Sequence, residues 1–148
     1  MSDFLEAMRE RMELKDVDVL TYSPLVLAYI GDAIFDVIIR TKVVNQGNMQ
    51  VQKMHDATIH YVKADAQAAM VAVLKDQLTP EELAVYKRGH NAKSHSSAKN
   101  ATIQNYRKAT GLEALFGYLY LTGKYDRLLD LVRAGLKGYD NSLFSSEE

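Results

Sequence analysis

The stretch Tyr29-Ile30-Gly31-Asp32-Ala33-Ile34-Phe35-Asp36 lies inside a long apolar run, Leu25 to Ile39, around which the rest of the chain is expected to fold. Such a run predicts a helix that is buried on nearly all sides. An ionised carboxylate in that setting loses favourable contacts with water unless a cation or hydrogen bonds replace them. The sequence therefore predicts that Asp32 is held ready for a metal ion or a partner.

The overall composition is that of an ordinary soluble chain. With 148 residues, of which 47% are hydrophobic and 25% charged, a single globular domain is expected. There is no cysteine, which excludes disulfides and thiolate metal sites and fits a cytoplasmic location. The apolar run is shorter than the roughly 20 residues of a membrane span, so no membrane segment is expected.

The net charge of −1 hides a basic segment on an acidic body. Leu83 to Leu112 contains no Asp or Glu but holds six of the eighteen basic residues, which leaves the remainder of the chain near −7. A local basic segment of this kind predicts a binding surface for a polyanion.

Long segments with helical spacing, and none with the alternation of strands, predict an all-α domain of six or seven helices. Pro24 and Pro80 follow the capping residues Ser23 and Thr79 and mark two helix starts. The domain is expected to occupy residues 1–140, and residues 141–148 a flexible acidic tail. The expected helices are Asp3–Lys15, Pro24–Val44, Asn48–Leu74, Pro80–Arg88, Ala101–Leu121 and Tyr125–Lys137.

Two of these helices combine an apolar body with one carboxylate and one internal glycine: Asp32 with Gly31, and Glu113 with Gly117. An internal glycine costs about 1 kcal/mol against alanine, which suggests close helix packing at that point. Close packing would bring the two acids together as an oxygen-only site suited to Mg²⁺ or Mn²⁺. The alternative is that each acid pairs with a base or caps a helix.

Asp36 stands four residues before Arg40, which is the spacing of an ordinary helical ion pair. We therefore interpret Asp36 first as a structural residue and only second as a site residue.

The basic segment contains Arg88-Gly89-His90-Asn91-Ala92-Lys93-Ser94, in which cations alternate with hydrogen-bonding and small residues. This mixture is typical of contacts to a phosphate backbone, although a charged run is more often simply a solvated face. No aromatic residue lies between Tyr86 and Tyr106, which disfavours stacking on single-stranded bases and favours a duplex.

Three motifs carry a resemblance to a known family. The stretch from Tyr29 to Asp36 resembles the signature helix of the ribonuclease III catalytic domain, and Glu113-Ala114-Leu115-Phe116-Gly117-Tyr118-Leu119 is similar to its second metal-binding helix. The segment Lys87–Ser94 is similar to that of a shorter branch of the family, in which no double-stranded-RNA-binding domain follows the catalytic one. The resemblance runs from about Ser23 to Lys137.

The chain departs from the full-length family at three positions. Further acids of that family would fall at Leu25, Ala28 and Thr110, and the shorter branch lacks these acids as well. The resemblance therefore carries over only Asp32 and Glu113 as catalytic and metal-binding residues.

The resemblance implies a homodimeric, Mg²⁺-dependent endoribonuclease, in which Mn²⁺ can substitute, that cuts double-stranded RNA. It implies as substrate the precursor of large-subunit ribosomal RNA, with a ribosomal protein as a candidate partner in presenting it. Two other interpretations stay open: a catalytically silent RNA-binding scaffold of the same fold, and a dimerisation module that does not bind RNA. The residues expected to bind RNA are Lys87, Arg88, His90, Asn91, Lys93, Ser94 and Lys99.

Overall fold

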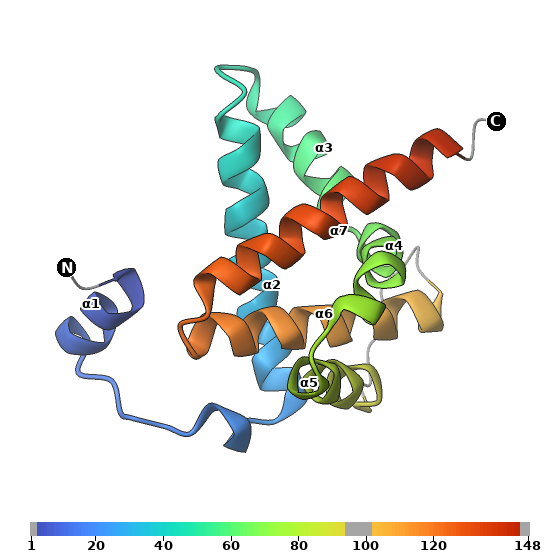
Figure 1. Cartoon of the computed structure of the whole chain (residues 1–148). Helices are drawn as coiled ribbons and strands as arrows, with labels where there is room; N and C mark the ends of the chain where they lie inside the picture. The colour runs from blue at the N-terminus through green and yellow to red at the C-terminus, as the bar shows by residue number, and fades with distance from the viewer. Residues whose placement is uncertain (1–2, 94–101, 146–148) are drawn as a thin grey trace.

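The computed structural model describes residues 3–93 and 102–145, which form α-helices and short 3-10 turns without a strand (Figure 1). The prediction of an all-α domain is confirmed. The 3-10 turns are η1 (Val19–Thr21) and η2 (Lys75–Gln77). The α-helices are α1 (Phe4–Arg11), α2 (Pro24–Val44), α3 (Val51–Val62), α4 (Ala64–Leu74), α5 (Pro80–His90), α6 (Ile103–Leu121) and α7 (Tyr125–Ser145).

Side-chain caps fix the helix starts that position the site. At the start of α2, the Ser23 hydroxyl accepts a hydrogen bond from the backbone at 3.3 Å, and Pro24 follows as the first helical residue. At α5, Thr79 and Glu82 form a reciprocal capping box, with bonds of 3.2 and 2.9 Å. These starts lie where the sequence predicts them.

Other boundaries differ from the prediction. The first helix is capped by Asp3 and ends at Arg11, so it is shorter than expected. The helix expected from Asn48 to Leu74 is broken at Lys63, whose backbone is extended with a ψ of 155°. The last helix continues through Ser145, so the first residues of the expected tail are helical.

Helix α6 is the centre of the molecule, because α2, α4, α5 and α7 all pack against it. The rings of Phe35 on α2 and Phe116 on α6 meet with centroids 5.4 Å apart in the middle of this core. Both side chains are fully buried. The chemistry-bearing residues of α6 are therefore held by neighbours on several sides.

Helix α2 is buried along one stripe of its surface. The prediction that it is buried on nearly all sides is wrong for the single chain. The stripe has the four-residue spacing of one helix face and consists of Leu27, Gly31, Phe35, Ile39 and Val43. The opposite side leaves apolar side chains in solvent, and Tyr29 is 81% exposed. Asp32 also lies on the exposed side.

The N-terminal arm, residues 3–22, is set apart from the helical body in Figure 1. Leu5 is buried, and Arg9 donates a hydrogen bond to the Leu121 carbonyl at 3.0 Å, which ties α1 to the end of α6. Among residues 3–93 and 102–145, no helix has the length and hydropathy needed to cross a membrane.

Candidate active site and nucleic-acid interface

Two glycines allow α2 and α6 to cross in backbone contact. A Cβ atom added to Gly31 would overlap the carbonyl of Glu113, and one added to Gly117 would overlap the carbonyl of Leu27. The contact is reciprocal, since each helix places a backbone carbonyl against the glycine of the other. This confirms that the internal glycines mark close packing. It also brings Asp32, which follows Gly31, close to Glu113, whose carbonyl lies against Gly31.

Asp32 and Glu113 line one hollow of about 360 Å³ between α2, α4 and α6. The carboxyl groups are close enough to share a hydrogen bond. The remaining lining residues are Leu25, Ala28, Val62, Ala64, Gln67, Tyr106, Ala109 and Thr110. The structure thus brings together the two acids that the sequence singles out, and Leu25, Ala28 and Thr110, where the resemblance would place further acids, also lie in this wall.

The fold makes Glu113 costly to ionise. Burial is the main cause, followed by the charge of Asp32 and the hydrogen bond with its carboxyl group, and together they raise the pKa of Glu113 from 4.5 to about 9. With a pKa of about 9, Glu113 is protonated at neutral pH when no cation is present. A cation in the hollow would favour the ionised form of both groups.

The donor set of this hollow suits Mg²⁺. Within the residues that the structure describes, no three His, Cys, Asp or Glu side chains gather as metal ligands. Mg²⁺ is commonly held by one or two carboxylates and keeps several waters, so that substrate phosphates complete its coordination. Asp32 and Glu113 provide this minimal set, and the hollow has room for the waters.

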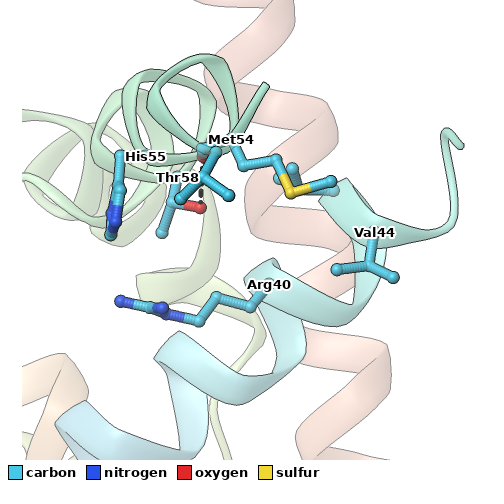
Figure 2. A pocket seen from close by; sticks show the side chains of 7 residues that line it. Arg40, Val44, Met54, His55 and Thr58 are labelled. Carbon is cyan, nitrogen blue, oxygen red and sulfur yellow. Dashed lines mark hydrogen bonds between the residues drawn. The ribbon is translucent and has the colours of Figure 1, made fainter. Parts of the chain in front are cut away.

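Asp36 is not part of this site. Its carboxylate accepts a hydrogen bond from Arg40 Nε at 2.7 Å, in the predicted helical ion pair. Arg40 also borders a separate, smaller hollow of about 120 Å³ between the end of α2 and α3 (Figure 2). In that view Arg40, His55 and Thr58 lie at one side and Val44 at the other, and none of the described residues that line the hollow is acidic.

The predicted RNA-binding residues on α5 and just after it are placed differently from one another. Lys87, Arg88, Asn91 and Lys93 are exposed, and His90 is partly buried with its Nδ1 2.9 Å from the Asn91 side-chain oxygen. Arg88 donates to a backbone carbonyl at the end of the N-terminal arm, 3.3 Å away, and so has a structural contact. The predicted residues Ser94 and Lys99 lie outside the described residues.

A basic hollow of about 330 Å³ unites part of this segment with α4 and α6. Its wall includes Lys87, His90 and Asn91, which the sequence predicts, and Lys75 and Lys108, which it does not. Lys108 belongs to the acid-free segment and could have been chosen on that ground. Lys75 contributes to the wall of this hollow from the end of α4, and no sequence motif predicts that position.

An all-α domain with a carboxylate pair at a glycine-mediated helix crossing is the arrangement expected of ribonuclease III catalytic domains, and the Ribonuclease III domain pattern matches residues 25–124. The chain belongs to the ribonuclease III family and is an endoribonuclease.

Its relatives place it beside the short branch of that family. It is 44% identical to Mini-ribonuclease 3 of Clostridium tetani, over 88% of this chain and 87% of that protein. It is 49% identical to Mini-ribonuclease 3 of Brevibacillus brevis, over 75% and 83% of the two chains. The crystal structure of a Fusobacterium nucleatum protein superposes with a TM-score of 0.76 and 27% identity, covering 82% of this chain and 99% of that one. These matches confirm the resemblance predicted from the three motifs.

Proposed function

We propose that this endoribonuclease cleaves double-stranded RNA with Mg²⁺ held between Asp32 and Glu113. The observation that carries the proposal is the pair itself: two carboxyl groups from different helices line one hollow, where burial and the nearby charge of Asp32 raise the pKa of Glu113 to about 9. Two acids placed against each other without a basic partner are costly, and a cation removes that cost.

The residues of the hollow have different roles in the proposed cleavage. Bound Mg²⁺ supplies Lewis-acid activation of a water and neutralises charge on the scissile phosphate. Glu113 would release its proton to hold the cation, and Asp32, which is exposed on α2, would hold the cation from the other helix. In-line attack leaves a 5′-phosphate and a 3′-hydroxyl.

The duplex backbone is held by the basic residues around α5. Lys75, Lys87, His90, Asn91 and Lys108 surround one hollow, so that several cations face the same volume. Lys/Arg and Asn side chains of this kind bind phosphate oxygens and carry little base specificity. As substrate we propose the precursor of large-subunit ribosomal RNA, with a ribosomal protein as presenting partner, which is what the resemblance of the three sequence motifs implies.

We further propose a homodimer whose interface covers the exposed apolar face of α2. We also propose a cytoplasmic location, which the absence of cysteine fits. The support is an almost continuous series of exposed apolar side chains along the N-terminal arm and the start of α2. The series consists of Phe4, Met12, Leu14, Val17, Leu20, Leu25, Val26 and Tyr29. Each protomer would then supply one site, and each site would cut one strand.

Incubation of the purified protein with a labelled RNA duplex, in Mg²⁺ or in EDTA, tests the proposal. Cleavage in Mg²⁺ alone, abolished in Asp32→Asn while the duplex still binds, is the expected result. Binding without cleavage under both conditions would identify the catalytically silent scaffold instead. A protein that neither binds nor cleaves duplex RNA would leave only the dimerisation module.

A further inference from the structure

Gln67 is buried next to the acidic hollow in a fixed orientation. It lies on α4 and is only 2% exposed. Its side-chain Nε2 donates a hydrogen bond of 3.0 Å to the carbonyl of Val62, at the break between α3 and α4. Because the amide nitrogen must face this carbonyl, the assignment of the two ends of the amide is settled, and the oxygen points away from Val62.

The oxygen of Gln67 has no partner. Among the described residues, Gln67 Oε1 is the one buried side-chain nitrogen or oxygen without a hydrogen bond. Buried amide oxygens are nearly always satisfied, so an orphaned one indicates a group that binds there in the working protein. Gln67 forms part of the wall of the hollow that contains Asp32 and Glu113.

We propose that Gln67 is a third oxygen donor of the cation site formed by Asp32 and Glu113. This inference rests on the proposed function, and it names a residue that neither the motifs nor the relatives assign. An amide oxygen suits the position because it offers Mg²⁺ the hard donor that it prefers. Being neutral, it adds no third negative charge to two acids that already repel each other.

The competing explanation is that Gln67 only caps the Val62 carbonyl at the helix break. The chain contains a matched case, since Gln77 Nε2 donates in the same way to the Val73 carbonyl at 3.3 Å, on an exposed turn that does not line the hollow. A variant of Gln77 therefore removes a cap of the same kind without touching the site.

The experiment measures Mn²⁺ binding to the full-length, metal-free protein by electron paramagnetic resonance, with thermal melting in parallel. Gln67→Leu removes the oxygen and the cap, and we expect its Kd for Mn²⁺ to rise about 10-fold, the lower end of the effect of removing a supporting group at a metal site. Gln67→Glu keeps an oxygen in place, and its binding should be no weaker than that of the wild type. Gln77→Leu should bind as the wild type does.

Each other outcome has a definite meaning. If Gln67→Leu binds Mn²⁺ like the wild type while Asp32→Asn does not, Gln67 is a cap or a water ligand only, and the inference is overturned while the proposed function stands. If Asp32→Asn also binds like the wild type, the cation site itself is absent and the proposed function fails with it. If Gln67→Leu does not fold, Gln67→Met takes its place, because its unbranched side chain has a similar length.

Discussion

The backbone of Gly31 lies directly against the carbonyl oxygen of Glu113, in a position where no Cβ atom fits. This contact is what sets the separation of the two acids, because Asp32 follows Gly31 on one helix and Glu113 is the other member of the pair. This contact joins backbone to backbone, so no side chain can move to relieve an added Cβ atom.

We expect Gly31→Ala to lower the free energy of unfolding by at least about 3 kcal/mol, because α2 and α6 must separate to accept the added Cβ atom. This is at or above the upper end of the usual cost of overpacking a protein core. Urea unfolding measures this. Gly135→Ala is the matched control, since a Cβ there meets mainly the flexible end of Met70. Equal destabilisation of the two variants would contradict the special role of the α2–α6 crossing.

Glu113→Gln should stabilise the cation-free protein at alkaline pH. The pKa of Glu113 is about 9 in the folded protein against an ordinary 4.5, so the folded state holds a proton that the unfolded state has released. Its contribution to stability is complete below pH 4.5 and is lost as the pH rises towards 9, at up to about 1.4 kcal/mol per pH unit. Thermal melts of both proteins in EDTA from pH 5 to 9 should diverge, and parallel curves would refute this. Asp36→Asn serves as the control.

The pair of Glu82 and Arg127 should produce the opposite pH dependence. Arg127 contacts both carboxylate oxygens at 2.9 Å, and these hydrogen bonds lower the pKa of Glu82 below 4.5. Stability from this pair is therefore present above pH 4.5 and is lost as the pH falls through the lowered pKa. Arg127→Met should cost about 2 kcal/mol at pH 7, less than a fully buried pair because Arg127 is partly exposed. Its deficit should shrink in acid, which urea unfolding at pH 7 and pH 3 would show.

Neutralising the basic hollow should weaken the salt dependence of RNA binding. We expect Lys87→Gln combined with Lys108→Gln to reduce the slope of log K against log[salt] by about 0.7–0.9 for each phosphate that the protein no longer neutralises. Filter binding of an RNA duplex in EDTA at several salt concentrations gives the slope. Lys53→Gln, on α3, provides the control. An unchanged slope in the double variant would mean that this surface is merely solvated.

Tyr29→Lys should convert the proposed dimer into a monomer, because it places a charge at the most exposed large apolar side chain among the described residues. Sedimentation velocity at several concentrations measures the change. Leu129→Lys, at a half-exposed position on α7, should leave the assembly intact. A wild-type protein that sediments as a monomer at every concentration would refute the proposed homodimer.

The sequence predicts the pair at the site because both acids stand close to glycines in apolar helices, and it predicts the helix starts at Pro24 and Pro80 from their caps. It assigns the burial to the wrong acid. Asp32 is one residue after Gly31, so it does not lie on the buried stripe that contains Leu27 and Phe35. The helical period of the sequence predicts this exposed position.

The break at Lys63 and the roles of Gln67 and Lys75 could not be predicted from local patterns. No glycine or proline marks the break, and the extended backbone at Lys63 lets α4 pack on α6 and α7 independently of α3. Gln67 and Lys75 gain their surroundings only through that placement. Their roles belong to the tertiary structure rather than to any motif.

The proton that Glu113 keeps at neutral pH bears on the order in which RNA and a cation would bind. Without a cation, the protonated Glu113 adds no negative charge to the hollow, which therefore repels a phosphate backbone less than it would with Glu113 ionised. An RNA duplex could therefore bind at the basic hollow before a cation binds between Asp32 and Glu113. In the proposed mechanism, a cation held between Asp32 and Glu113 would therefore also have to displace the proton of Glu113.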